Sequence, residues 1–598
     1  MAVRLFPKAV AQRRSENGGL SYLSDWQVHS AHITAGAISS LACGLETGPI
    51  YVPMPTGSGK TTGAVWGIVD FAEQYPDKRL CFLTPYKEAV ETVYANLAKH
   101  LGDDIVGYYH SDAFADKSAE LSKRIIVLTH SFIEYNQGRL DDRDLFVVDE
   151  AIYATGEASL KLQHFDEARS WATSNNIYPE AFVELSDFAN ELDVQLRESG
   201  KKYVAPLLDR EFPWAATINK INLQEHSQTI TSMDVLVAVQ RFCEALLQGL
   251  VFLSKGSSDK TRYDPVFSAA VLGIPRIEKT VILSATGGMV YDIAGPFKQD
   301  LGSREYWTPP SYERLRLVQL AGPDIAGSYN TWSSASKKDQ VTAYVDWLLT
   351  TISEPTIYMT MPKKILEGCL RGYLDQQKTG VIEYPIKTTK HGKQLHISHH
   401  ARSVGSNAFK DCEAVVYLWD NHLPQSVHVQ KFHTLADKEI TEEALEDANS
   451  GTLVGDYSRI RKAQFIDNMM QQVGRGQVRS IDEYAVAAPM TAYVLTEPNL
   501  FESLAAQYRG CTTDQLQYEE IVVNEPTGRI ARILSYIRNS TTKADIPVKE
   551  IEQALGFDLR RYRSQLEGDW DLAMLGYQFQ AGEKGRGKAG YFKWLGEQ

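Results

Sequence analysis

A glycine-rich loop between a short strand and a helix is the feature that most constrains the fold of this chain. The loop contains Pro53, Pro55, Gly57 and Gly59, and it follows a β-prone run at 50–52. After the loop, apolar residues recur at helical spacing, at Val65, Ile68, Val69 and Ala72. Glycines let backbone N–H groups converge on a phosphate, and a helix N-terminus adds positive potential. The sequence therefore predicts a phosphate-binding loop on a strand–loop–helix unit.

Two side chains of this loop have distinct expected roles. Lys60 is expected to reach the β- and γ-phosphates of a nucleotide, and Thr61 to ligate Mg²⁺. Met54 stands where the general GxxxxGK[ST] pattern has its first glycine. The other residues expected to line the phosphates are Thr56, Gly57, Ser58, Gly59 and Thr62. ATP and Mg²⁺ are therefore the expected cofactors.

A second apolar strand, at 145–148, leads into two acids, Asp149 and Glu150. In an open parallel sheet, the carboxyl ends of the strands face the ligand crevice. We expect Asp149 to hold Mg²⁺ through water, and Glu150 to orient and activate the attacking water. Together with the phosphate loop, this pair predicts hydrolysis of a nucleoside triphosphate.

The size and composition are those of a multidomain cytoplasmic protein. The 598 residues exceed what one core can hold, so the length predicts three or four domains. No apolar stretch reaches the roughly 18 residues that a membrane helix needs, and the basic N-terminus lacks the apolar region of a secretory signal. The six cysteines form no CxxC pair, which argues against a zinc ribbon or a four-cysteine iron–sulfur cluster and fits a reducing compartment.

The net charge of −13 does not give the basic footprint that is usual for nucleic-acid-binding domains. The charge is uneven along the chain, however. Residues 527–598 contain 12 Lys and Arg against 9 Asp and Glu, so the C-terminal tail is the basic part of the protein. Local patches of this kind steer ligands even when the whole chain is acidic.

The phosphate loop and the acid pair resemble those of superfamily 2 helicases of the DEAD/DEAH type, and further short motifs follow in the order of that family. One strand, at 81–83, ends at Thr84 and Pro85, and another, at 125–128, ends at Thr129 and His130. Both are similar to strand ends with which the family contacts the nucleic-acid backbone. The resemblance therefore implies nucleic-acid contacts at these four residues.

Three more motifs resemble the family. Gln27 stands where the family places an adenine-reading glutamine. The sequence Ser284-Ala285-Thr286 is similar to the motif that couples hydrolysis to domain movement, and the segment at 404–407 resembles motif V. The resemblance assigns the coupling of hydrolysis to movement to Ser284, Ala285, Thr286, Gly405 and Asn407.

The segment 471–479, QQVGRGQVR, matches the QxxGR core of motif VI. The chemistry requires such a cation, because γ-phosphate transfer spreads charge over three oxygens and an arginine from the facing domain stabilises it. Gln471, Arg475 and Arg479 are the expected catalytic residues of this motif. Arg479 lies four residues after Arg475, whereas the family pattern has three, so a one-residue bulge is expected to absorb the difference.

The resemblance implies an α/β fold with two tandem RecA-like P-loop NTPase domains. We expect the first domain at 1–311, with a helical insertion at about 153–278, and the second at 312–515. Helicases of the DinG/XPD type carry an arch domain at the position of the insertion, which suggests a strand-guiding element. A helical cap without a role on DNA is the alternative. The chain has neither the cysteines nor enough residues for the DinG/XPD cluster domain, so any relation to those helicases is expected to be distant.

The tail, at 520–598, resembles a winged helix. Three amphipathic helices are expected around Ile533, Ile551 and Leu559, and two β-prone runs follow, at 575–579 and 591–595. In such a module the third helix enters a groove while the wing contacts phosphate. The expected contacts are Arg560, Arg561, Arg563, Arg586 and Lys588. Winged helices also dock proteins, and that interpretation stays open.

These features together predict an ATP-dependent helicase or translocase, with nucleic acid as its partner and DNA favoured over RNA. Partners from replication, repair or defence would bind the C-terminal domain, and no membrane is involved. The alternative is an ATP-regulated loader or switch that binds DNA without unwinding it. Translocation polarity, oligomeric state and pathway do not follow from the sequence.

Overall fold

A computed structural model of the protein contains two compact units, 1–517 and 518–598. Placement is described for residues 24–112, 116–135, 140–150, 155–207, 211–223, 225–226, 232–255, 264–272, 277–284, 298–299, 309–321, 332, 337–370, 387–388, 392–400, 409–420, 423–449, 455–518, 530, 533–534, 536–537, 544–562, 566, 572, 577–580 and 590–595. No helix in these ranges is long and apolar enough to cross a membrane.

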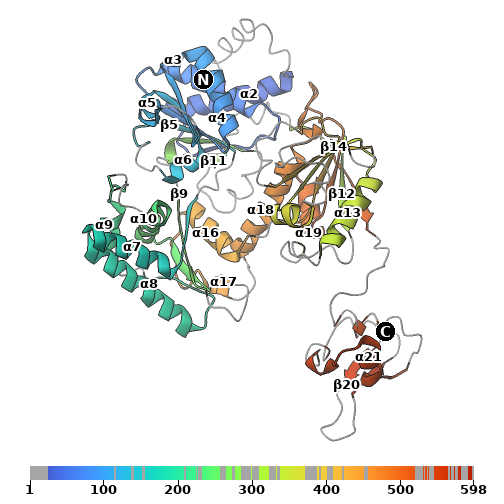
Figure 1. The fold of residues 1–598 in the computed structure, drawn as a ribbon. Coiled ribbons are helices and arrows are strands. Elements are labelled where there is room, and N and C mark those ends of the chain that lie inside the picture. Colours follow the sequence, from blue (N-terminus) through green and yellow to red (C-terminus); the bar gives the residue numbers. More distant parts are fainter. Residues whose placement is uncertain are drawn as a thin grey trace. The chain divides into compact units, whose positions relative to one another are not determined.

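The first unit contains a parallel seven-stranded sheet in the order β11-β1-β10-β5-β2-β4-β3. Figure 1 labels two of its strands, β5 and β11. Because side chains alternate along each strand, the buried strands face two cores. Val147 packs into one core and Val148 into the other. The strands are β1 (Ile50–Val52), β2 (Leu80–Thr84), β3 (Val106–Tyr109), β4 (Ile125–Thr129), β5 (Leu145–Asp149), β10 (Thr280–Leu283) and β11 (Lys298–Gln299).

Three helices pack on one face of this sheet: α2 (Asp25–Ala42), α3 (Lys60–Gln74) and α4 (Lys87–Leu101). Helices α2 and α3 approach closely because Gly63 and Gly67 present no side chain. A Cβ at Gly63 would collide with the carbonyl of Ala31, and one at Gly67 would lie 3.0 Å from the Cα of Ala35. This close packing fixes α2 against the helix that begins at the phosphate loop. Two short helices, α5 (Lys117–Ser122) and α6 (His130–Tyr135), flank β4.

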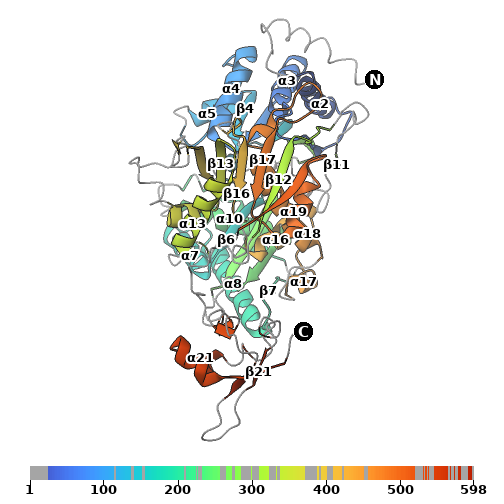
Figure 2. The same ribbon diagram turned by 90° about the vertical axis from the view of Figure 1, so that its right-hand side faces the viewer.

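A second seven-stranded sheet follows in the same unit, in the order β14-β15-β13-β16-β17-β12-β18. Figure 2 shows β13, β16, β17 and β12 side by side. All pairs are parallel except β14 with β15. Its strands are β12 (Leu315–Ala321), β13 (Thr356–Met361), β14 (Lys387–Thr388), β15 (Gln394–His399), β16 (Ala414–Tyr417), β17 (Met490–Val494) and β18 (Thr512–Gln517).

The helices of this second half include α13 (Lys338–Thr351), α14 (Lys363–Ile365), α18 (Gly455–Val473) and α19 (Pro498–Ala505). A π-helical turn, η4 (Leu366–Leu370), continues α14. Two sheets of parallel strands with helices packed on them are the architecture of tandem RecA-like domains. The α/β fold class that was expected from the sequence is therefore confirmed.

The sequence suggested a helical insertion, but the segment between β5 and β10 contains strands as well as helices. Its helices are accompanied by an antiparallel sheet in the order β6-β9-β8-β7. The helices are α7 (Leu162–Asn175), α8 (Pro179–Ser199), α9 (Pro213–Asn219) and α10 (Met233–Leu247), and the strands are β6 (Thr155–Leu160), β7 (Tyr203–Val204), β8 (Val251–Ser254) and β9 (Val266–Leu272).

The apolar run from Met233 to Leu253 is divided between α10 and β8. Gly249 has a φ of +70°, a backbone conformation that glycine tolerates best and that ends the helix. The N–H of Leu250 donates back to the carbonyl of Ala245 at 2.8 Å. Periodicity did not reveal this break, because apolar residues lie on both sides of it and fit either element.

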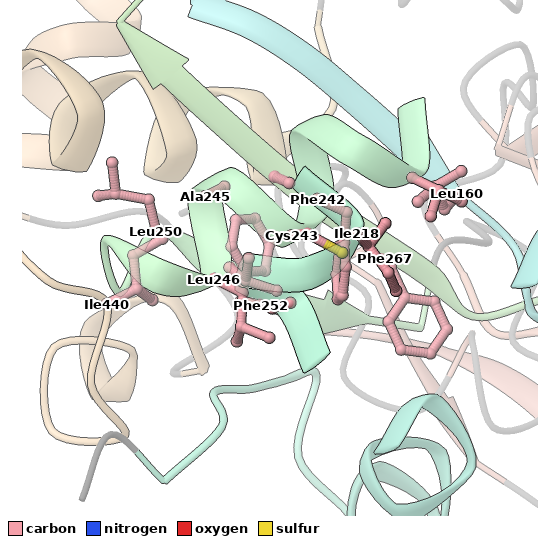
Figure 3. Packing of buried hydrophobic residues seen from close by; sticks show 14 of the residues in the cluster. Leu160, Ile218, Phe242, Cys243, Ala245, Leu246, Leu250, Phe252, Phe267 and Ile440 are labelled. Atoms are coloured by element: carbon pink, nitrogen blue, oxygen red, sulfur yellow. The ribbon is translucent and has the colours of Figure 1, made fainter. Parts of the chain in front are cut away.

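The insertion shares a core with α16 (Gln425–Ala436) and α17 (Glu446–Asn449), which belong to the second half of the chain. Figure 3 shows Leu250 and Ile440 in this core, and the N–H of Ile440 donates to the carbonyl of Gly249 at 2.7 Å. The amide side chain of Asn449 bonds the backbone of Tyr203 at 2.8 and 3.1 Å. Hence the insertion is joined to the second half by hydrogen bonds as well as by apolar packing.

The C-terminal unit contains a small antiparallel sheet in the order β19-β21-β20, packed on a core of its own. Its described elements are β19 (Ile546–Pro547), α21 (Val548–Leu555), the 3₁₀ helix η6 (Leu559–Tyr562), β20 (Tyr577–Gln580) and β21 (Tyr591–Trp594). The side chains of Arg560 and Arg561, and all of Arg563, Arg586 and Lys588, lie outside the described residues.

Candidate active site

The glycine-rich loop leads from β1 into α3 through two left-handed residues. Gly57 has a φ of +85° and Gly59, the N-cap of α3, a φ of +83°. Lys60, the first helical residue, is almost fully buried, and its Nζ donates to the carbonyls of Met54 and Pro55 at 2.8 and 3.0 Å. Burial lowers the pKa of Lys60, whereas the carboxylates of Glu150 and Asp149 act to raise it. A buried ammonium group that donates to two loop carbonyls suits a polyanionic ligand such as a triphosphate.

Asp149 ends β5 and lies opposite this loop. The hydroxyl of Thr61 donates to Asp149 Oδ2 at 2.8 Å. Burial raises the pKa of Asp149 to about 6, and the neighbouring Glu150 adds to this, while Thr61 and Lys60 act in the opposite direction. A hydroxyl and a carboxylate are oxygen donors of the kind that Mg²⁺ takes beside phosphate oxygens. Thr61 and Asp149 therefore fit a Mg²⁺ site.

Glu150 has a φ of +66°, which is uncommon for a residue with a side chain. Its N–H donates to the carbonyl of Leu283 at 2.7 Å, so the end of β10 holds this backbone in place. Left-handed backbone at a non-glycine residue costs on the order of 1–3 kcal/mol and tends to occur at functional sites.

Two arginines come to this site from the second half of the chain. Arg475 follows α18, is 3% exposed, and its Nε has no hydrogen-bond partner among the described residues. Burial lowers the pKa of Arg479 to about 10, with a further lowering by Arg475 and an opposing effect of Glu150. A 3₁₀ turn, Gln477–Arg479, accommodates the extra residue between the two arginines. Both cations act on the pKa of Lys60, so they lie near the phosphate loop.

The contact between the phosphate loop and the arginine loop is tight. A Cβ added at Gly57 would collide with the carbonyl of Arg479. A Cβ added at Gly474 would lie 3.2 Å from Thr56 Oγ1. We call this contact of 56–57 with 474–479 the seam. It brings the cations of the second half against the loop of the first.

Gln27 connects the N-terminus of α2 to the phosphate loop. Its Nε2 donates to the carbonyl of Gly57 at 2.7 Å, and its Oε1 accepts from the N–H of Ser24 at 3.0 Å. The hydroxyl of Ser24 accepts from the N–H of Gln27 at 3.2 Å, which completes a capping box. The glutamine is therefore placed beside the loop, with both ends of its amide already hydrogen-bonded.

The residues at the ends of β2 and β4 are less exposed than a backbone-contacting role would suggest. Thr84 and Thr129 are 1% and 7% exposed. The ring of His130 lies 3.0 Å from the carbonyl of Asp149, and burial lowers its pKa to about 4. His130 thus supports the strand that bears the acids, while Pro85 is half-buried.

Ser284 is fully buried, and its carbonyl accepts from the hydroxyl of Tyr51 at 3.1 Å. Gln471 lies half-buried on α18, one residue before Gln472. The sequence did not single out Gln472, yet its amide accepts from Tyr358 at 2.9 Å and donates to the carbonyl of His400 at 3.0 Å. Two adjacent glutamines offer no signal that separates them. The expected coupling residues Ala285, Thr286, Gly405 and Asn407 lie outside the described residues.

The fold is that of two tandem RecA-like α/β domains, as the sequence resemblance had predicted. Residues 33–164, from α2 to the start of the insertion, match the family model of the DEAD/DEAH box helicases, which supports the predicted resemblance to superfamily 2 helicases. The family implies the use of ATP and Mg²⁺.

Solved structures similar to this chain include an XPD helicase, with 13% identity, a TM-score of 0.45, and coverage of 83% of this chain and 100% of the other. Xpd4 of S. tokodaii has 14% identity and a TM-score of 0.42, over 82% and 99% of the two chains. Dbp5 of S. cerevisiae, solved with RNA and ADP BeF3, has 11% identity and a TM-score of 0.39, over 86% and 94%. No curated protein matches the sequence.

Proposed function

We propose that this protein is an ATP-dependent helicase or translocase that hydrolyses ATP between its two RecA-like domains and thereby moves along or unwinds DNA. The observation that carries the proposal is the seam, where the backbone of Arg479 lies against Gly57 and the two arginines of the second half approach Lys60 and Glu150 of the first. A kinase or signalling GTPase has no reason to carry arginines from a second α/β domain at its phosphate loop.

Each side chain has a part in the proposed reaction. Lys60 binds the β- and γ-phosphates, while Thr61 and Asp149 hold Mg²⁺, which neutralises phosphate charge when it is bound. Glu150 orients the attacking water and accepts its proton. Arg475 stabilises the charge that develops on the γ-phosphate, and Arg479, beside Glu150, adds positive potential. Gln27 is the proposed contact to the adenine.

The division into domains at 1–311 and 312–515, with an insertion at about 153–278, remains part of the proposal, as does a winged helix at 520–598. The sheet order β19-β21-β20, with a short strand ahead of α21 and a hairpin behind it, supports the winged helix. In this proposal, the module adds DNA affinity or docks a partner protein.

Two assays test the proposal. ATP turnover is measured with and without single-stranded DNA, and strand displacement is measured on tailed duplexes at saturating ATP. Lys60→Ala is the control, because it removes the phosphate contact. We expect DNA-stimulated turnover and strand release in the native protein and neither in Lys60→Ala. Turnover without strand release or movement would favour the loader or switch, and near-normal turnover in Lys60→Ala would overturn the assignment of the site.

A further inference from the structure

Trp26 differs from the rest of its helix in where its side chain is buried. Helix α2 packs on α3 and on β1 and β10 of the first sheet. Trp26, in its first turn, is 7% exposed and belongs to a hydrophobic cluster whose other buried members all come from the second half of the chain, between Tyr312 and Tyr508. That cluster includes Val478, Ile481 and Ala485, which adjoin the arginine loop. One tryptophan of the first half is therefore buried in the core of the second.

Trp26 is connected to the site through the next residue in the chain, Gln27. Gln27 donates to the carbonyl of Gly57, and Gly57 lies against the backbone of Arg479 at the seam. The capping box with Ser24 fixes the first turn of α2, so Trp26 and Gln27 cannot move independently over large distances. The loop that carries Arg475 and Arg479 is thus held at two places, at the seam and in the cluster around Trp26.

We propose that Trp26 is a positioning residue for ATP hydrolysis: its burial in the second-half core holds Arg475 and Arg479 against the phosphate loop. This inference rests on the proposed function. An aromatic side chain of this size buries about 150–250 Å². That area is removed from water only while the two halves are closed, so Trp26 biases the protein toward the closed arrangement. It acts through the arginines and contacts neither phosphate nor metal.

Kinetics of Trp26→Ala test the proposal. We expect the kcat for ATP to fall at least about tenfold, which corresponds to about 1.4 kcal/mol in the barrier, while the dissociation constant for the nucleotide changes by less than about twofold. Trp26→Phe should restore most of kcat, because an aromatic ring refills much of the cluster. Trp66, 6% exposed and packed between α2 and α3 with Ala31 and Ala35, provides the control. Trp66→Phe should lower the melting temperature and leave kcat unchanged.

Other outcomes would overturn the inference. A loss of nucleotide affinity as large as the loss of kcat would mean that Trp26 stacks on the adenine. An unchanged kcat in Trp26→Ala would mean that the arginines are positioned without it. If Trp26→Ala does not fold, the comparison of Trp26→Leu with Trp66→Leu decides, since only the first should lower kcat without weakening nucleotide binding.

A second measurement does not depend on hydrolysis. The emission that comes from Trp26 is obtained by subtracting the fluorescence of Trp26→Phe from that of the native protein. Its quenching by acrylamide reports the exposure of the ring. We expect protection in the native sequence and its loss when Gly57→Ala obstructs the seam. If the native protein hydrolyses no ATP but this pattern holds, the proposed function fails and the burial of Trp26 across the two halves stands. If Trp26 is equally protected with Gly57→Ala, the proposed closure role is wrong.

Discussion

The hydroxyl of Thr61 and the carboxylate of Asp149, 88 residues apart in the chain, form a hydrogen bond of 2.8 Å. Thr61 is the second residue of α3, and Asp149 is the last residue of β5. The hydrogen bond fixes both oxygens before any ligand arrives. Binding of Mg²⁺ then requires little rearrangement of the protein, which lowers the cost of ordering the site.

Glu150→Gln is expected to bind ATP with near-native affinity and to hydrolyse it slowly. Asp149 and Thr61 keep the Mg²⁺ ligands, whereas the amide cannot accept the proton of the attacking water. General-base catalysis typically contributes about 10²–10⁴ in rate, so the loss in kcat should fall in that range. Nucleotide affinity and single-turnover hydrolysis are the measurements. A loss of nucleotide affinity as large as that of Lys60→Ala would show that Glu150 binds the nucleotide rather than activating the water.

Arg475→Ala is expected to reduce kcat by about 10³ or more, with a much smaller effect on nucleotide affinity. The guanidinium is buried, and its Nε has no hydrogen-bond partner among the described residues, so a phosphate oxygen would satisfy it. Turnover and equilibrium binding are compared for the same variant. Equal losses in both would assign Arg475 a structural role.

Gly57→Ala is expected to abolish ATP turnover, whereas Gly200→Ala should not affect it. Both glycines have positive φ, at +85° and +66°, so both substitutions strain the backbone by about 1–2 kcal/mol. At Gly57 the added Cβ would collide with the arginine loop. A Cβ added at Gly200, the C-cap of α8, would meet no atom of the described residues within 4 Å, its chain neighbours aside. Turnover and melting temperature are measured for both. A similar loss of activity in Gly200→Ala would mean that strain alone explains the effect.

The stability of the protein should depend on pH through His400. Burial lowers the pKa of His400 to about 4, below its usual value near 6.5. Its ring lies 2.9 Å from the carbonyl of Trp419 and 2.9 Å from the hydroxyl of Thr360, an arrangement that suits the neutral form. Its stabilisation is full above pH 6.5 and is lost as the pH falls toward 4. The loss is on the order of 3 kcal/mol at most, since one pKa unit corresponds to about 1.4 kcal/mol.

His400→Gln provides the test, because an amide can donate and accept at the same two positions without titrating. Urea unfolding at about pH 7 and about pH 4.5 gives the free energy of unfolding for both proteins. We expect the difference between the two pH values to be smaller in the variant. An equal difference would show that His400 does not cause the acid sensitivity.

Deletion of 520–598 is expected to leave a folded ATPase, because 518–598 forms a compact unit with its own core. Affinity for duplex DNA should fall, and its salt dependence should flatten by about 0.9 in the log–log slope for each phosphate that the tail no longer neutralises. Neutralising Arg560, Arg561 and Arg563 in one variant, and Arg586 and Lys588 in another, would separate the contribution of the third helix to DNA affinity from that of the wing. Superimposable salt curves with and without the tail would mean that it docks protein.

Local patterns predicted the elements that bear the chemistry. The strand, loop and helix around Lys60 appear as β1 and α3, and the apolar strand before Asp149 appears as β5. Each is encoded within a short run of consecutive residues by turn residues and by one periodicity. The insertion was less predictable, since apolar residues continue from α10 into β8 and the break between them depends on the backbone of Gly249.

The sequence by itself determined that this chain has a phosphate loop, an acid pair and a motif with two arginines, and that it folds as tandem RecA-like domains. Only the tertiary structure decided which of these groups meet: the hydroxyl of Thr61 with Asp149, and the backbone of Arg479 with Gly57. It also decided that Trp26 is buried in the second half. Such contacts join residues separated by up to several hundred positions, and they depend on the packing of whole sheets and helices, which no local periodicity records.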